Sequence, residues 1–447
     1  MKKYKLGDLI EVTRGAGLSG DFYAASGKYI RLTCGNFDYR NNSFKENTSK
    51  DNLFYTGEFR TEFLLDKGDL ITPLTEQAIG LLGSTAWIPE SGKYIQSQDI
   101  AKITCKEDLL DKKFAYYLIS SNMVKQQLSA AAQQTKIRHT SPDKIKDCTV
   151  WLPSLEKQKQ IGQLLFDLDR KIEINREINH NLEAMAKQLY DYWFVQFDFP
   201  DENGKPYKSS GGKMVWNEKL KREIPEDWKV AQLGNLCSFR NGINYAKDEI
   251  GEPYAIVNVR NISATSILLD GEDFDVITIP LSKATNYILT EKDIVIARSG
   301  CPGSTRLLHT SNKTLFCGFI ICCTPIEEYL RNYITLFLKI LEGSSATTSG
   351  GSILQNVNQD TLKSLWIILP SIKLLMIFDR FLKDLIDLLY SNSMAIKILT
   401  KQRDELLPLL MNGQVKVGVE RSQLNYDLIF LDSPIFFVIM MYHQNNY

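Results

Sequence analysis

Apolar residues recur at seven-residue spacing in two long stretches of the chain, and charged residues flank both. The second stretch repeats the first 217 residues further on. The main rows consist of Ile161, Leu168, Asn175, Leu182 and Leu189, and of Phe378, Leu385, Asn392, Leu399 and Leu406. Each has a second apolar row beside it, formed by Leu165 and Ile172 and by Leu382, Leu389 and Ile396. Sustained heptads predict two long helices that pair as a coiled coil.

Asn175 and Asn392 hold equivalent places in the middle of the two heptad rows. A polar residue in an apolar seam lowers stability but fixes the register of the helices. We therefore expect both asparagines to lie in the seam and to set the coiled-coil register. Each helix of about 40 residues would be about 60 Å long at about 1.5 Å per residue.

The rest of the chain shows short β-branched and aromatic stretches. Examples are LIEVT, KYIRLT and DLITPL in the first half, and YAIVNV and DIVIA in the second. Clusters of Gly, Asn, Asp and Ser separate them, which predicts mostly β, loop-rich domains. We expect one helix within each domain, around residues 112–121 and 329–341.

Three segments of the first half recur in the same order in the second half. LGDL (6–9) returns as LGNL (233–236), LLDKGDLIT (64–72) as ILTEKDIVI (288–296), and DKIKDCTVWLPS (143–154) as DTLKSLWIILPS (360–371). The offset drifts only from 227 through 224 to 217 residues. We interpret this as a tandem duplication with small changes of loop length.

The predicted fold class is α+β, with two tandem mostly-β domains, each followed by a long α-helix, and with the two helices pairing as an antiparallel coiled coil. The expected division is a first β domain (1–152), a central helix (153–197), a linker rich in Pro, Gly and Ser (198–228), a second β domain (229–369), a C-terminal helix (370–415) and an atypical tail (416–447). Antiparallel pairing would place the β domains at opposite ends. That suits two contacts on a DNA duplex, although a coiled coil can also serve only as a scaffold that holds protein partners apart.

Composition narrows the possible functions. The formal net charge is +0, so a nucleic-acid surface would have to be local. The eight cysteines form no C-x-x-C pair and the four histidines are scattered, so we expect no zinc site. The start of the chain lacks the apolar core of a signal peptide, and no stretch reaches the roughly 20 apolar residues of a membrane span. We therefore expect a cytoplasmic protein without membrane contact.

Two motifs formally resemble catalytic ones. Gly15-Ala16-Gly17-Leu18-Ser19-Gly20 fits G-x-G-x-x-G, but the turn-like sequence after it does not predict the helix that a dinucleotide site needs. Pro142-Asp143 with Asp169-Arg170-Lys171 resembles a nuclease pattern, but we expect Asp169 on the solvated face of the heptad helix. The chain contains no Walker A, G-x-S-x-G or H-E-x-x-H motif. We therefore expect no enzyme, no cofactor and no metal.

Several segments together resemble one family. These are the LGDL start, DIVIARSGCPGSTRLL (293–308), GGSILQN (350–356), and LPS leading into a long helix. LEAMAKQLYDYWFVQF (182–197) and LTKQRDELLPLLMNGQV (399–415) resemble two conserved helical regions of the same family. Residues 1 to about 417 are thus similar to the specificity (S) subunit of Type I restriction-modification systems.

The resemblance implies a role and partners. The two β domains would be target-recognition domains, each reading one half of a bipartite, asymmetric site in double-stranded DNA. The helices would dock two methyltransferase (M) subunits, and restriction (R) subunits would join outside, so that the catalytic steps belong to the partners. The chain departs from the family after Pro370, where IKLLMIF lacks the glutamate-glutamine pattern kept as LEKQKQIG after Pro153, and in the tail from 419 to 447.

Basic and amide residues in predicted loops are the candidate DNA contacts. Arg can grip guanine with two hydrogen bonds, Asn and Gln can grip adenine, and Lys mainly meets phosphate. Arg298 is the best single candidate, because its loop follows a predicted strand. The candidates are Arg14, Arg31, Asn36, Arg40, Arg60, Gln77, Lys136, Arg138 and His139 in the first copy, and Arg240, Asn241, Lys247, Arg260, Asn261, Arg298 and Arg306 in the second. The aromatic residues near the helix ends, Trp151, Tyr190, Tyr192, Trp193, Phe194 and Trp366, could be core or a docking surface.

Overall fold

The computed structural model describes the chain except residues 40, 50, 77–79, 132–137, 247–248, 264–265, 270, 272–273, 310–312, 345–356 and 415–447. The described part divides into two compact units. The first unit combines Met1–Glu173 with the end of the last helix from Ile396, and the second combines the segments from Ile174 to Ala395. Each unit therefore contains one β domain and parts of both long helices.

The first β domain is built on a four-stranded sheet with the order β10-β8-β12-β2. These strands are β10 (Ala86–Trp87), β8 (Leu70–Pro73), β12 (Ile100–Cys105) and β2 (Ile10–Arg14). A second four-stranded sheet has the order β11 (Tyr94–Ile95), β4 (Tyr29–Arg31), β7 (Phe54–Tyr55) and β3 (Tyr23–Ala24). Three further pairs of strands complete the domain: β1 (Lys2–Lys5) with β14 (Thr149–Leu152), β13 (Arg138–His139) with β9 (Thr75–Glu76), and β5 (Phe37–Asp38) with β6 (Ser43–Phe44). Its helices are α1 (Leu6–Leu9), α2 (Lys112–Ile119), α3 (Asn122–Ala131) and α4 (Pro142–Lys146).

The second β domain repeats this plan. Its main sheet has the order β18-β24-β21-β22, formed by β18 (Cys237–Asn241), β24 (Ile320–Pro325), β21 (Ile294–Ala297) and β22 (Thr305–Leu307). Beside it are β20 (Asp275–Ile279), β19 (Glu252–Val257) and β23 (Thr314–Phe316), and the pair β17 (Lys229–Gln232) with β25 (Trp366–Leu369). Its helices are α6 (Val259–Ile262), α7 (Leu281–Ala284), α8 (Arg331–Ser344) and α9 (Gln359–Ser364).

The strand registers of the two domains match at the offsets seen in the sequence. Lys2 pairs with Leu152 in the first domain, and Lys229 pairs with Leu369 in the second. The chain that follows β2 forms a parallel bridge from Ala16 to Ser97, and the equivalent bridge after β18 joins Ile243 to Cys317. The duplication therefore extends from the sequence to individual backbone pairs.

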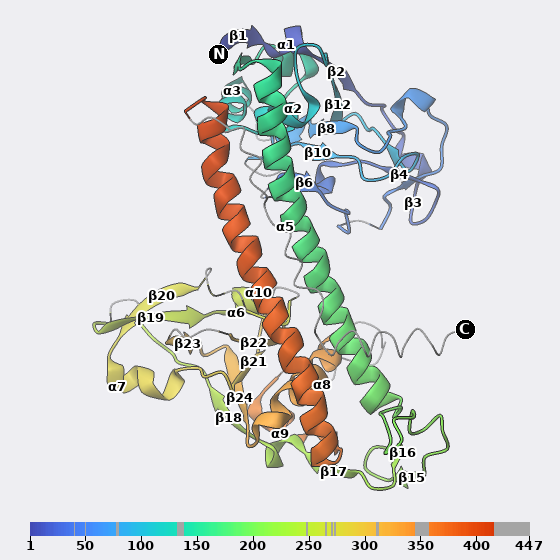
Figure 1. Cartoon of the computed structure of the whole chain (residues 1–447), viewed down its shortest axis with the longest axis vertical. Helices are drawn as coiled ribbons and strands as arrows, with labels where there is room; N and C mark the ends of the chain where they lie inside the picture. Colours follow the sequence, from blue (N-terminus) through green and yellow to red (C-terminus); the bar gives the residue numbers. More distant parts are fainter. Residues whose placement is uncertain are drawn as a thin grey trace. The chain divides into compact units, whose positions relative to one another are not determined.

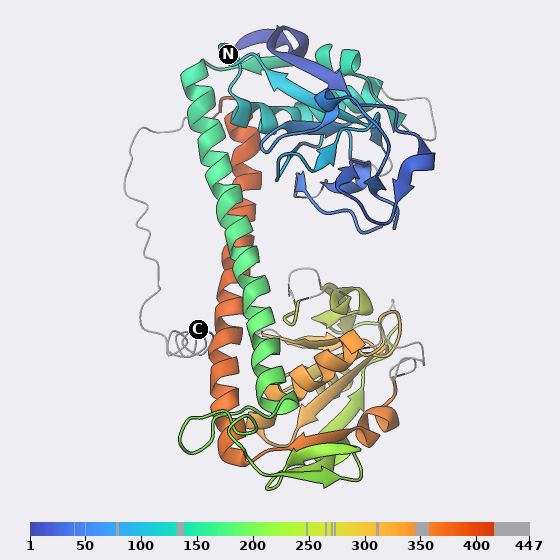
Figure 2. The same ribbon diagram turned by 90° about the vertical axis from the view of Figure 1, so that its right-hand side faces the viewer.

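The two long helices are α5 (Leu155–Tyr190, 36 residues), which continues into a π-helical turn over Asp191–Val195, and α10 (Ile372–Met411, 40 residues). In the first unit Arg403 lies 2.8 Å from Asp169, and in the second Asn179 donates to Ser393 at 3.1 Å. Within the second unit the Tyr190 ring lies 6.2 Å from that of Phe378, so residues further along α5 than Asn179 meet residues earlier along α10 than Ser393, which is antiparallel pairing. Figures 1 and 2 show the green α5 and the red α10 side by side within each unit. The predicted fold class is confirmed.

The heptad rows form the seam in each unit. Leu165 and Ile172 of α5 are buried in the first unit, and Leu382 and Leu389 of α10 in the second. Asp169 was expected on the solvated face, and this expectation was wrong. Its carboxylate faces α10 and is only 26% exposed, because Arg403 binds it there.

Polar groups occupy the seam of the second unit. The amide nitrogen of Asn392 is buried there without a hydrogen-bond partner among the described residues. Asn179, which the heptad analysis did not select, bonds across the seam to Ser393. Asn175 is half-buried. A role of Asn175 and Asn392 in setting the register stays a prediction.

The aromatic residues where α5 ends are core. Tyr190, Trp193 and Phe194 are buried in the second unit. Phe194 meets the ring of Phe378 edge-on at 4.8 Å and that of Tyr333 at 4.7 Å. Aromatic pairs in this geometry stabilise a core beyond the area they bury. The core interpretation therefore holds for these three side chains.

The segment expected as a plain linker is folded. It carries a hairpin of β15 (Met214–Asn217) and β16 (Arg222–Pro225), antiparallel to each other. Phe199 stacks on Trp228 at 4.7 Å, and both belong to the core of the second unit. The Pro, Gly and Ser content that suggested a linker instead supplies the turns of this segment, for example at Gly204 and Gly211, which have positive φ angles.

Candidate nucleic-acid interface

The candidate contacts predicted from the sequence divide into three groups. Arg40, Gln77, Lys136 and Lys247 lie outside the described residues, and Arg138 is described only as backbone in β13. A second group is buried or held in ion pairs. The third group is exposed or half-buried at the surface of the two domains and is not held by a carboxylate inside a domain.

Arg31 and Asn36 are buried inside the first domain, at 7% and 2% exposure. The guanidinium of Arg31 lies 3.8 Å from the centre of the Tyr23 ring and donates to the Asn52 carbonyl at 3.2 Å. Asn36 accepts from the Thr33 backbone N–H at 2.9 Å and so caps a turn. Both side chains hold the domain together, and the structure does not bring them to a surface.

Arg306 is the most deeply buried candidate, at 1% exposure. Its two terminal nitrogens lie 2.9 and 3.1 Å from the carboxylate oxygens of Glu342 on α8. Burial raises the pKa of Glu342, but the hydrogen bond and charge of Arg306 outweigh it and hold that pKa below its ordinary value of 4.5. Arg306 therefore anchors β22 to α8 and is not a surface contact.

Arg240 is likewise a structural cation. It lies 2.8 Å from Asp293, whose side chain is 2% exposed, and donates to the Asn286 and Ile288 carbonyls at 2.7 and 3.1 Å. Asp293 also accepts from the Thr290 backbone N–H. A buried carboxylate requires such a partner, because an unpaired charge is costly away from water.

In the first domain the equivalent carboxylate is paired with a different cation. Asp69, the counterpart of Asp293, lies 2.8 Å from Lys102 on β12. Lys102 faces Thr13 across the strands, and the corresponding facing pair in the second domain is Cys322 and Arg240. The acidic residue is thus at the same position in both domains, but its cation comes from β12 in the first domain and from β18, the equivalent of β2, in the second.

Arg260 and Asn261 belong to α6. Arg260 is exposed, but its guanidinium lies 2.6 Å from Asp275 on β20. Asn261 accepts from the Asn258 backbone N–H at 2.8 Å and completes a capping box. A contact of either with DNA would compete with these bonds.

The exposed candidates of the first domain gather near the chain that follows β2. Arg14 and Arg60 line one pocket of about 410 Å³ with Glu58, Phe59 and Phe63, and residues 15–18 complete its lining. Arg60 lies over the Phe63 ring at 4.7 Å and pairs with Glu62 at 3.1 Å, with its side chain 73% exposed. His139 is exposed, and its Nδ1 lies 3.3 Å from the Thr75 hydroxyl.

The glycine pattern beside this pocket has a steric reason. A Cβ on Gly15 would stand 2.2 Å from the Gln96 carbonyl oxygen, and one on Gly242 would stand 2.0 Å from that of Cys317. The two glycines are equivalent in the two domains, and each lets two backbone segments approach closely. This requirement accounts for Gly15 without nucleotide binding.

In the second domain the remaining candidates are Asn241, which is exposed, and Arg298, which is half-buried. Arg298 follows β21 and donates to the Gly318 carbonyl at 3.3 Å. Next to that carbonyl stands Phe319, which is 64% exposed. Neither Phe319 nor the exposed Gln98 of the first domain was among the candidates predicted from the sequence. An apolar residue such as Phe319 next to a predicted strand is expected to be buried, and only the conformation of the turn shows that it is exposed.

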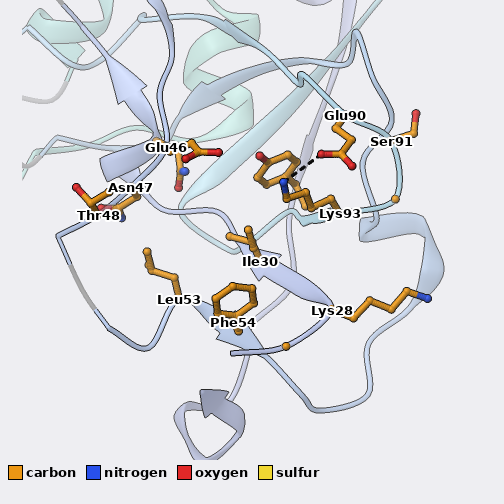
Figure 3. Close-up of a pocket in the computed structure, with 14 residues that line it drawn as sticks. Lys28, Ile30, Glu46, Asn47, Thr48, Leu53, Phe54, Glu90, Ser91 and Lys93 are labelled. Carbon is orange, nitrogen blue, oxygen red and sulfur yellow. Dashed lines mark hydrogen bonds and ion pairs between the residues drawn. The ribbon is translucent and has the colours of Figure 1, made fainter. Parts of the chain in front are cut away.

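A larger pocket of about 520 Å³ lies elsewhere in the first domain (Figure 3). Its floor is apolar, with Ile30, Leu53 and Phe54. Lys93 at its rim is paired with Glu90 at 3.1 Å. With Lys28 and Glu46 also in the lining, opposite charges balance, so the pocket offers no clear attraction for phosphate.

Two absences hold for the described part of the chain. No group of three or more His, Cys, Asp or Glu side chains there could hold a metal ion. Nor does any helix of that part combine the length and apolar character needed to cross a membrane.

Taken together, these observations define a tandem-repeat protein whose two β domains share one backbone plan and expose different side chains on it. The sequence matches the family described as Type I restriction modification DNA specificity domain over residues 1–184 and 225–392, which takes in both repeats. The chain belongs to this family.

Relatives and a solved structure agree with this assignment. The chain is 24% identical over 318 residues to the Type I restriction enzyme MjaIX specificity subunit of Methanocaldococcus jannaschii, covering 70% of this chain and 71% of that one. It is 21% identical over 377 residues to the HindI specificity subunit of Haemophilus influenzae, covering 72% and 81%. The crystal structure of a Type I restriction-modification S subunit from M. genitalium shares the fold, with a TM-score of 0.56 at 16% identity, over 92% of this chain and 95% of that chain.

Proposed function

We propose that this protein is the DNA-sequence-recognition subunit of a Type I restriction-modification complex and reads a bipartite, asymmetric site. The observation that carries the proposal is the family match over both repeats. Two domains with one backbone plan but different exposed residues are suited to two different half-sites. In this proposal the target-recognition domains are residues 1–152 and 229–369, and each reads one half.

The subunit itself would be non-catalytic and act through partners. Its relatives are named as specificity subunits of Type I restriction enzymes. The proposed partners are double-stranded DNA, two methyltransferase subunits and restriction subunits, with methyl transfer and cleavage carried out by those partners. No observation favours the scaffold function that the helix pattern alone left open. That the paired helices fix the spacing between the half-sites stays a prediction.

The proposed DNA surface is formed by four exposed candidates, Arg14, Arg60, His139 and Asn241, together with the half-buried Arg298. Their guanidinium, imidazole and amide groups can reach base edges or phosphates. Arg31, Asn36, Arg240 and Arg306 are left out of this surface because their side chains are engaged inside the domains.

The test is selection from a random duplex library with the purified full chain, followed by affinity measurements at 50 and 200 mM salt. The expected result is an enriched site of two different half-sequences separated by unspecified bases, bound with an affinity that falls steeply with salt. Duplexes altered only in the spacer should bind as the selected site does, and duplexes altered in one half should bind more weakly. Failure to enrich any sequence, or salt-independent binding, contradicts the proposal.

A further inference from the structure

An arginine is hydrogen-bonded to the same turn in both domains. In the first domain Arg14 Nε donates to the Gln98 carbonyl at 2.7 Å. In the second domain Arg298 Nη1 donates to the Gly318 carbonyl at 3.3 Å. In each case one N–H of the guanidinium fork is used on the protein.

The two turns are equivalent by their backbone bonds. Gly15 N–H donates to the Ile100 carbonyl at 3.2 Å, and Gly242 N–H donates to the Ile320 carbonyl at 3.0 Å. Each turn follows the bridge residue named above and leads directly into the next strand, β12 or β24. Gln98 and Gly318 therefore hold the same place, two residues before Ile100 and Ile320 respectively.

The arginines themselves are not equivalent in sequence. Arg14 ends β2, and the residue at that position of β18 is Asn241. Arg298 directly follows β21, and the position that corresponds in the first domain is Leu74, which is 2% exposed. A guanidinium therefore binds the equivalent turn carbonyl in both domains, but it comes from β2 in the first domain and from the end of β21 in the second. The cations that pair with Asp69 and Asp293 likewise come from strands that are not equivalent.

The surroundings of these two arginines differ from those of the structural ones. Arg240 and Arg306 each bind a carboxylate. Within the part of the chain that the structure describes, neither Arg14 nor Arg298 forms an ion pair. Side chains that can contact bases stand beside them: Gln98 is exposed next to Arg14, and Phe319 is exposed next to Arg298. Glutamine can read adenine, and an exposed phenylalanine can contact the thymine methyl group.

We propose that Arg14 and Arg298 are functional equivalents, each contacting a base pair of its own half-site from the same turn of its domain. The turn carbonyl orients the fork, and the remaining N–H groups are directed to guanine. The neighbouring Gln98 and Phe319 make the two turns read different bases. This inference rests on the proposed function and deepens it by naming the reading element.

The test compares Arg14→Gln and Arg298→Gln in the full chain, by duplex selection and by affinity for the wild-type site. Glutamine keeps one N–H for the turn carbonyl but removes the charge and the fork. We expect each variant to lose discrimination in one half-site only, and in different halves, by roughly 5- to 150-fold against the wrong base. The matched control is Arg222→Gln, since Arg222 also donates to a backbone carbonyl, that of Val195 at 2.8 Å, but lies in the β15–β16 hairpin.

A second variant tests the equivalence directly. Asn241 occupies the β18 position that Arg14 occupies on β2, and it is exposed. The double variant Asn241→Arg with Arg298→Gln should regain the discrimination lost in the single variant, because it delivers a guanidinium to the turn as the first domain does. This rescue also separates loss of reading from loss of folding.

The outcomes separate the two proposals. A wild-type chain that selects no sequence contradicts the proposed function. A wild-type chain that selects a bipartite site, with both arginine variants behaving as Arg222→Gln does or weakening both halves equally, overturns the equivalence of Arg14 and Arg298. Absence of rescue by Asn241→Arg overturns it as well.

Discussion

Arg403, near the end of α10, lies 2.8 Å from Asp169 in the middle of α5, and Asp169 also accepts from the Tyr117 hydroxyl of α2 at 2.6 Å. One carboxylate therefore joins the first β domain to both long helices within the first unit. At the places related by the offset of 217 residues the second unit has apolar, buried residues, Ile386 for Asp169 and Ala186 for Arg403. The duplication has kept the positions and changed the chemistry that fills them.

The Asp169 pair should matter for stability in a way that depends on both partners. We expect Arg403→Ala to lower the free energy of unfolding by roughly 2–3 kcal/mol, because it leaves a largely buried carboxylate without its cation. The triple variant Tyr117→Leu, Asp169→Ile, Arg403→Ala makes all three positions apolar, with the residues of the second unit at the last two, and should recover most of the loss. Urea unfolding measures both values. A triple variant less stable than Arg403→Ala would contradict this account.

The ion pair of Arg240 with Asp293 gives a second prediction. We expect Arg240→Thr to lower the free energy of unfolding by about 3 kcal/mol, since Asp293 is then buried without its partner. Adding Cys322→Lys recreates the arrangement of Thr13 and Lys102 and should restore most of the stability. The control is Arg260→Gln: its ion pair with Asp275 is exposed, so a loss of less than about 1 kcal/mol is expected. Equal losses for Arg240→Thr and Arg260→Gln would show that burial of Asp293 is not the cause.

The Arg306–Glu342 pair should make stability depend on pH. The pKa of Glu342 is below 4.5 in the folded protein, so the ionised carboxylate contributes stability above about pH 4.5, and this contribution is lost as the pH falls through the lowered pKa. Glu342→Gln should lower the free energy of unfolding by about 3 kcal/mol at pH 7, where it removes the carboxylate that the buried Arg306 binds. The difference between variant and wild type should shrink as the pH falls below 4.5. Unfolding curves from pH 7 to pH 3 measure it, and a constant difference would contradict the assignment.

The unpaired amide of Asn392 gives a prediction of opposite sign. Its nitrogen is buried in the seam without a partner among the described residues. Asn392→Leu should raise the free energy of unfolding by about 1 kcal/mol, because it removes an unsatisfied polar group and adds apolar contact. Asn175→Leu, at a half-buried position without such an atom, serves as the control and should change stability less. A loss of stability in Asn392→Leu would contradict this account.

The sequence by itself determined the repeat, the fold class and the antiparallel helices. Heptad rows and β-branched stretches are local periodic patterns, and a duplicated pattern can be read without knowing any contact. The candidate site could be predicted only in part. The sequence offered Arg14 and Arg298 among its candidates, but nothing in the sequence distinguished them from Arg240 or Arg306.

Only the tertiary structure decided that distinction. Whether an arginine is a structural cation depends on which carboxylate lies beside it, and Asp293 and Glu342 are brought to their partners by strand pairing and by α8, from 53 and 36 residues away in the chain. Aligning the two repeats does not match Arg14 with Arg298, because the two side chains reach the equivalent turn from different strands. The periodicity of a sequence shows which face of a helix or strand is buried, whereas an ion pair joins residues of different elements and forms only when folding brings those elements together.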